Sequence, residues 1–340
     1  NIVSERLQQA MQDGQVVIQG QTLDINTAIK ENADYLRSRF QDENGHTYLL
    51  AIDPYHYYRL AENYLDHGFD RDVEVEGGYV DSHTQGGMPI EERGFITSRI
   101  NVFHVFFEAY FYKIVSIFDP DITLMRTSFF VPVIFAALAT IPAFFIGRRF
   151  AGNTAGLLSG LIIAIHPSFL TRTVAGFTDT DAYNVFFPLL IMWVFFEAFY
   201  AKKSKNAYLL IGLAGLFTGL FSFAWAGWWY TFDFLIFVLI AYLVYLGLTY
   251  LLHKNNKEKL FSAGLLTAIF LISTGLFTAI FSTFSNFTSA LFQPFHFTQI
   301  KDVGLKLWPN VLTTVAEMNP SNLSSTMSQI SLSTISLSGV

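Results

Sequence analysis

Six long apolar segments are the feature that most constrains how this chain can fold. An α-helix needs about 20 apolar residues to cross a bilayer. Hydrophobic residues make up 52% of this chain and charged residues only 14%, whereas soluble domains carry about 25% charge. The sequence therefore predicts an all-α, polytopic membrane protein with six crossings, over residues 127–147, 152–170, 182–201, 207–224, 229–252 and 260–283.

Two other parts of the chain predict helices that do not cross the membrane. Over residues 1–50, apolar side chains recur at three- and four-residue spacing among polar ones, which is the pattern of an amphipathic helix. Residues 100–118 are only marginally long enough to span and contain His104, Glu108 and Lys113, so we predict an interfacial or extracytoplasmic helix there. The chain begins at Asn1 with neither Met nor a signal peptide, so we expect a preceding segment to be missing.

Basic clusters orient the predicted bundle. They lie in every second loop, at residues 148–149, 202–205 and 254–259, and the positive-inside rule assigns such loops to the cytoplasm. The intervening loops are then extracytoplasmic. The two glycosylation sequons, at Asn286 and Asn322, fall on this external side as well.

Three acidic motifs also fall on the predicted external side. Asp53 precedes the bundle, Asp179 and Asp181 follow the second apolar segment, and Glu317 follows the sixth. A carboxylate at the edge of a bilayer is costly unless it is paired, hydrated or bound to a cation, so several on one face indicate a metal site. Each motif also has a structural alternative: Asp53 could begin a turn or cap a helix, Asp179 and Asp181 could cap the helix from Ala182, and Glu317 could be a solvated loop charge.

Together these motifs resemble those of the catalytic subunit of asparagine-linked oligosaccharyltransferases, most of all the archaeal single-subunit enzymes. The resemblance extends from about Leu50 to the C-terminus. It implies the fold of lipid-phosphosugar-dependent (GT-C type) glycosyltransferases. Three runs carry it: Asp53-Pro-Tyr-His-Tyr-Tyr-Arg-Leu-Ala-Glu-Asn, Arg172-Thr-Val-Ala-Gly-Phe-Thr-Asp-Thr-Asp and Trp308-Pro-Asn-Val-Leu-Thr-Thr-Val-Ala-Glu.

The resemblance implies a reaction and a set of partners. A preassembled glycan would pass from a dolichol-phosphate or dolichol-pyrophosphate carrier, with inversion, to the amide of Asn in an acceptor sequon, on the extracytoplasmic face of the cell membrane. The expected partners are thus a lipid-linked oligosaccharide, a sequon-containing polypeptide and membrane lipid. No basic patch in the sequence indicates nucleic acid.

The resemblance also assigns roles to individual residues. Asp53, Asp179 and Asp181 would bind Mn²⁺ or Mg²⁺, which suit an all-oxygen site and neutralise a leaving phosphate as a Lewis acid. Asp53 and Glu317 would hydrogen-bond the two N–H groups of the acceptor amide. Arg172 could contact the donor phosphate, or it could be an interfacial anchor.

The order of the motifs predicts four parts of the chain. They are a polar helical segment (1–50), a first external loop with interfacial helices (51–126), a membrane bundle carrying Asp179 and Asp181 (127–285) and an external loop with the Thr-x-x-Glu motif (286–340). Three features depart from the family: Ala51 stands where Gly is usual, the family has more crossings between its second and third motifs, and its C-terminal soluble domain, with a Trp-Trp-Asp-Tyr-Gly signature, has no counterpart. We therefore expect weak order over 318–340, and no transfer to a sequon peptide by the isolated chain.

Two other functions fit part of this pattern. The first is another lipid-phosphosugar-dependent glycosyltransferase that acts on a hydroxyl acceptor, but such an enzyme does not need the second amide partner that Glu317 would provide. The second is a cation transporter, which would be expected to carry its charges near the membrane midplane. Here the acidic motifs lie at the external ends of the predicted helices.

Overall fold

The computed structural model describes residues 15–18, 21–42, 45–68, 70, 73–75, 78–80, 102–201 and 204–293. The chain divides into two compact units, Asn1–Leu50 and Ala51–Val340. In the first unit, strands β1 (Gln15–Ile18) and β2 (Gln21–Asp24) form an antiparallel hairpin, and helix α2 (Ile25–Arg39) follows. The helix predicted over 1–50 is therefore wrong at residues 15–18 and 21–24, where Val, Ile and Thr favour strands.

The second unit begins with short elements outside the long helices. These are α3 (Ile52–His67), β3 (Val73–Val75), β4 (Gly78–Val80), α4 (Val102–Val115) and α5 (Leu124–Ser128). Strands β3 and β4 pair as an antiparallel hairpin. Helix α4 has 14 residues and is too short to cross a membrane, as the sequence predicts. It packs on α3 through Leu60, Ala61 and Val105, and the Tyr64 and Phe106 rings meet edge to face at 4.8 Å.

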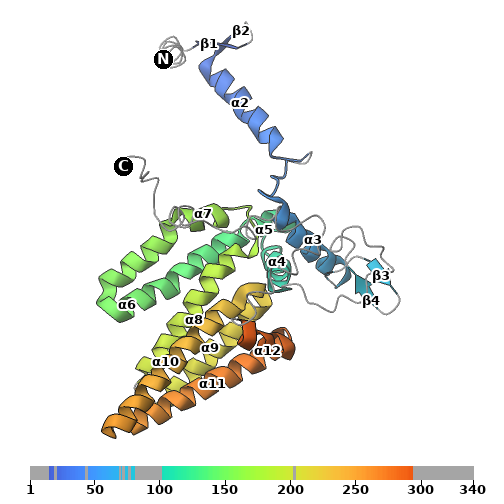
Figure 1. Ribbon diagram of the computed structural model, residues 1–340. Helices are drawn as coiled ribbons and strands as arrows, with labels where there is room; N and C mark the ends of the chain where they lie inside the picture. Colours follow the sequence, from blue (N-terminus) through green and yellow to red (C-terminus); the bar gives the residue numbers. More distant parts are fainter. Residues whose placement is uncertain are drawn as a thin grey trace, which may run out of the picture. The chain divides into compact units, whose positions relative to one another are not determined.

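A helical bundle forms the rest of the described chain (Figure 1). Five of its helical segments are long and apolar enough to cross a membrane, which supports a multi-pass membrane protein. The bundle elements are α6 (Val131–Ile165), α7 (Pro167–Thr173), η2 (Thr180–Ala182), α8 (Tyr183–Tyr200), α9 (Ser204–Ala224), η3 (Ala226–Trp228), α10 (Trp229–His253), α11 (Lys257–Phe281) and α12 (Phe284–Phe292).

The five segments count α6 once, but its two limbs largely correspond to the first two predicted crossings, 127–147 and 152–170. Backbone angles leave the helical region at Ala151 (φ −141°) and Gly152 (φ 82°, ψ −173°). A positive φ with this ψ is accessible almost only to glycine, so the helix bends sharply there. Figure 1 shows the two limbs of α6 folded back beside each other.

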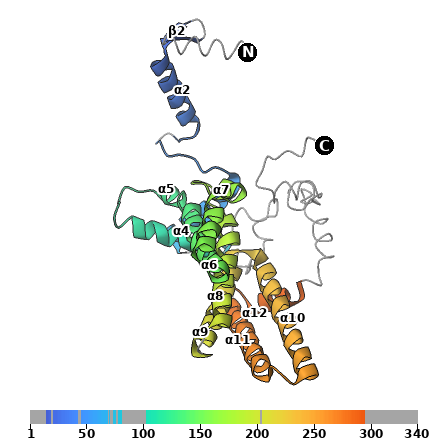
Figure 2. The ribbon, with the colours of Figure 1, turned by 90° about the vertical axis from the view of Figure 1, so that its left-hand side faces the viewer.

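Helix α9 lies at the centre of the bundle, between α8 and α11 (Figures 1 and 2). Its contact with α11 is close because glycine faces the neighbouring backbone. A Cβ atom on Gly219 would lie 2.5 Å from the Cβ of Phe277 and 2.9 Å from the backbone nitrogen of Thr278. Small residues at four-residue spacing, here Gly215 and Gly219, allow membrane helices to approach in this way.

The basic bend of α6 lies at the same end of the bundle as the loop after α8. The Arg149 guanidinium pairs with the Glu197 carboxylate, and its Nε donates to Glu197 Oε1 at 2.9 Å. Glu197 lies in the last turn of α8, just before the lysine cluster. Arg172 and Asp181 lie at the opposite end of α8, where both precede its first residue, Tyr183. This separation of basic and acidic loops agrees with the topology predicted from the charges.

Candidate active site

The second acidic motif alternates buried and accessible side chains. Thr178 is fully buried and Thr180 is 6% exposed, whereas Asp179 and Asp181 remain partly accessible. Asp179 has an extended backbone (φ −131°, ψ 175°), whereas Thr180 and Asp181 begin the short helix η2. The two threonines therefore anchor the segment, and the two carboxylates are left to face outward.

Asp179 also caps the short helix η2. Its Oδ1 accepts from the backbone N–H of Thr180 at 2.5 Å and from the Thr180 hydroxyl at 3.3 Å. The capping role that the sequence left open as an alternative is thus present. The hydrogen bonds of the Asp179 side chain all go to Oδ1, so capping and ligand binding by the same carboxylate are compatible.

Arg172 lies beside this motif, at the end of α7. Its Nη1 is 3.5 Å from Asp181 Oδ2, and its guanidinium lies over the Phe177 ring at 5.4 Å. The side chain is still 56% exposed, so an exposed ion pair of this kind is weak. The guanidinium can therefore exchange its carboxylate partner for a phosphate oxygen.

Tyr57 connects the first acidic motif to the second. It lies one helical turn after Asp53 on α3, so both side chains share one face of that helix. The pKa of Tyr57 is raised to about 12, chiefly by burial and then by the negative charge of Asp179, with smaller contributions from Asp53 and Asp181. A side-chain hydrogen bond with Thr180 opposes this increase. Three carboxylates from the two motifs thus act on one phenol.

Asp53 itself is exposed and lies in the first turn of α3. The N-cap of this helix is Ala51, which makes no side-chain capping bond, so the predicted alternative of a cap by Asp53 is not observed. No hydrogen bond or ion pair joins Asp53 to another described residue. A carboxylate in the first turn of a helix is favoured by the helix dipole. Asp53 therefore suits this position without making a capping bond.

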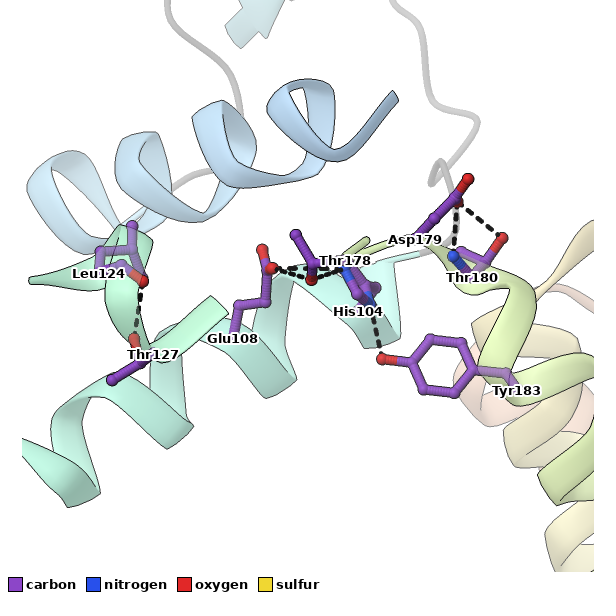
Figure 3. A network of polar contacts seen from close by, with 8 residues as sticks. All are labelled: His104, Glu108, Leu124, Thr127, Thr178, Asp179, Thr180 and Tyr183. Carbon is purple, nitrogen blue, oxygen red and sulfur yellow. Dashed lines mark hydrogen bonds and ion pairs between the residues drawn. The ribbon is translucent and has the colours of Figure 1, made fainter. Parts of the chain in front are cut away.

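A buried polar network lies directly behind the second motif (Figure 3). The Thr178 hydroxyl is 2.7 Å from Glu108 Oε1 and 3.1 Å from His104 Nε2, and His104 Nδ1 is 2.6 Å from the Tyr183 hydroxyl. His104 Nε2 also lies 3.3 Å from Glu108 Oε1, with both side chains fully buried. The sequence attributed these two residues to an interfacial helix, and their only signal was spacing by four residues on one face of α4.

The carboxylates that would hold a metal come from two segments. Among the described residues, no three His, Asp or Glu side chains lie close enough together to form a ready metal cluster. Asp53, Asp179 and Asp181 supply only oxygen atoms, which chemically fits Mg²⁺ or Mn²⁺. All three carboxylates contribute to the raised pKa of Tyr57. Glu317 lies outside the described residues, as do residues 318–340 and the sequon at Asn322.

Comparison with known proteins gives the family to which this arrangement corresponds. A profile described as "Oligosaccharyl transferase STT3, N-terminal" matches residues 25–339. The dolichyl-phosphooligosaccharide-protein glycotransferase of Methanococcus voltae is 32% identical over 350 aligned positions, which cover 95% of this chain and 37% of that protein. The chain therefore spans little more than a third of the length of this relative.

Two solved structures share the fold. One is the archaeal oligosaccharyltransferase AglB from Archaeoglobus fulgidus in complex with an inhibitory peptide and a dolichol-phosphate, with a TM-score of 0.50 and 17% identity over 89% of this chain and 37% of that one. The other is the A. fulgidus oligosaccharyltransferase in complex with zinc and sulfate, with a TM-score of 0.50 and 19% identity over 76% and 34% of the two chains. Both support the predicted GT-C type fold.

Proposed function

The chain belongs to the oligosaccharyl transferase STT3 family, and on that premise we propose that it transfers a preassembled glycan to asparagine. The donor is a dolichol-phosphate or dolichol-pyrophosphate carrier, and the acceptor is the side-chain amide of Asn in a sequon. The reaction depends on a divalent cation and inverts the anomeric carbon. It takes place on the extracytoplasmic face of the membrane.

The observation that supports this proposal is that Tyr57, one turn after Asp53, contacts the His104 ring, and His104 in turn contacts Thr178, the residue before Asp179. Asp53 shares a helix face with Tyr57, and Asp179 and Asp181 lie close enough to raise its pKa. On this basis we assign acidic groups from two segments, separated by more than a hundred residues, to one site. A structural role alone does not require this, because like charges repel unless a cation separates them.

Each of these residues has a separate role in the proposed reaction. Asp53, Asp179 and Asp181 would hold Mn²⁺ or Mg²⁺, which supplies Lewis-acid stabilisation of the leaving phosphate. Arg172 binds a phosphate oxygen by exchanging its ion pair with Asp181. Asp53, together with Glu317, accepts hydrogen bonds from the acceptor amide and weakens its conjugation, which makes the nitrogen a better nucleophile.

Removal of divalent cations is expected to stop the reaction. In membranes supplied with a dolichol-linked donor and a fluorescent peptide containing Asn-x-Thr, EDTA should abolish glycopeptide formation, and Mn²⁺ should restore it. A peptide with Gln in place of Asn is the matched control and should remain unmodified. Full transfer in EDTA would contradict metal dependence. Modification of the Gln peptide would indicate a hydroxyl acceptor instead of an amide.

Cysteine labelling in intact cells is expected to show the orientation. The chain has no cysteine, so a single introduced thiol reports only its own position. Ala175→Cys lies in the exposed loop before the second motif, and Asn153→Cys lies just after the basic bend of α6. An impermeant maleimide should label the first and spare the second because basic loops remain in the cytoplasm. The reverse labelling would place the acidic motifs on the cytoplasmic side.

A further inference from the structure

We propose that His104, Glu108 and Thr178 form a bracket whose task is to position Asp179 for the reaction proposed above. The bracket joins helix α4 to the loop that carries the second acidic motif (Figure 3). This inference rests on the proposed function. It assigns His104 and Glu108 as positioning residues, since both act on the site through Thr178.

The hydrogen bonds of the bracket have one consistent direction. Thr178 has a single hydroxyl proton, and the carboxylate of Glu108 can only accept, so the hydroxyl donates to Glu108 Oε1 at 2.7 Å. The N–H at His104 Nε2, 3.1 Å away, must therefore donate to Thr178 Oγ1. With one bond given and one received, the Thr178 side chain is held in a single orientation, next to Asp179 in the chain.

Stability alone does not explain this set of residues. Burying charged groups is costly, and a well-packed apolar set of similar volume is often as stable as a buried ion pair. Glu108 Oε2 is buried and has no hydrogen-bond partner among the described residues, which adds to the cost. Apolar side chains cannot supply directional hydrogen bonds, and these bonds fix where the next residue, Asp179, is placed.

The bracket also contacts the helix that carries the first motif. The Tyr57 ring meets the His104 ring edge to face, with centroids 4.8 Å apart and planes at 70°. Tyr57 shares its helix face with Asp53. His104 therefore contacts both the Asp53-bearing helix and, through Thr178, the Asp179 loop, so it fixes one motif relative to the other.

Hydrogen exchange of the folded chain in detergent provides a test that needs neither donor nor metal. Thr178→Val keeps the side-chain shape and removes both hydrogen bonds, so exchange over residues 174–182 should accelerate about tenfold or more. Thr178→Ser retains the hydroxyl and should exchange like the unsubstituted chain. The control is Thr127→Val, since Thr127 is 1% exposed and its hydroxyl bonds only within α5. Unchanged exchange over 174–182 in Thr178→Val would overturn the bracket.

Manganese binding then separates positioning from simple stabilisation. Loss of the free Mn²⁺ signal in electron paramagnetic resonance reports binding, and loss of a residue that supports a metal ligand typically weakens affinity about 10–100-fold. Thr178→Val should bind Mn²⁺ more weakly by this factor. Thr127→Val should bind Mn²⁺ as the unsubstituted chain does, even if its thermal stability equals that of Thr178→Val. Equal Mn²⁺ affinity in Thr178→Val and the unsubstituted chain would overturn the positioning role. Absence of Mn²⁺ binding by the unsubstituted chain would contradict the proposed metal site instead, and the exchange measurement would still decide the bracket.

Discussion

Replacing Asp179 with asparagine is expected to lower glycan transfer by about 10²–10³-fold, the cost typical of losing one electrostatic stabiliser of a transition state. Asparagine keeps the side-chain oxygen that caps η2, so the bond from the Thr180 N–H remains. The variant therefore removes charge with little effect on the fold. Measurement of glycopeptide formation at saturating donor, in membranes where the unsubstituted protein is active, gives the ratio directly.

A matched pair on α3 extends this test to the first motif. Asp53→Asn should cause a loss of similar size, whereas Asp66→Asn, an exposed position in the last turn of the same helix, should leave the rate unchanged. Both substitutions remove one carboxylate from one helix, so general effects of charge cancel. Equal rates for the two variants would remove Asp53 from the active site. An undiminished rate for Asp179→Asn would remove the second motif.

Replacing Gly219 with alanine is expected to destabilise the bundle by about 1–3 kcal/mol, the usual cost of overpacking. The new Cβ would lie 2.5 Å from the Cβ of Phe277 and 2.9 Å from the Thr278 backbone nitrogen. Contacts this short force α9 and α11 apart. Thermal unfolding in detergent, followed by loss of the monodisperse peak in size exclusion, measures the decrease in Tm.

Gly212→Ala in the same helix is the control, and it should not lower the Tm. A Cβ there meets no atom within 4 Å, and alanine is more favourable than glycine inside a helix by about 0.5–1 kcal/mol. Its Tm should therefore stay equal or rise. A Tm for Gly219→Ala as high as that of Gly212→Ala would mean that the two helices do not depend on the close approach at Gly219.

The bundle could be predicted largely from apolar segment length, because a membrane imposes that length on a helix. Helices α8, α9, α10 and α11 match four predicted crossings. The first two crossings largely correspond to the two limbs of α6, which meet at Ala151 and Gly152, where the backbone angles are not helical. The hairpin of β1 and β2 was missed because residues 15–24 are too short a run for periodicity to separate strand from helix.

The candidate site was predictable only in part. The spacing of Asp179 and Asp181 and the position of Asp53 pointed to the external face, but no local pattern places Tyr57 between them. Contact between α3 and the second motif depends on tertiary packing over more than a hundred residues. His104 and Glu108 looked like polar residues of an interfacial helix, and only the fold places the hydroxyl of Thr178 against both. Family resemblance supplied Glu317, which lies outside the described residues.

The central claim is that the two acidic motifs share one divalent cation. Anomalous scattering from a crystal of the protein soaked in Mn²⁺ tests it most directly. We expect a single strong peak within about 2.0–2.6 Å of carboxylate oxygens from both Asp53 and Asp179. Either no peak at this end of the bundle, or a peak bound by only one of the two motifs, would contradict the shared site.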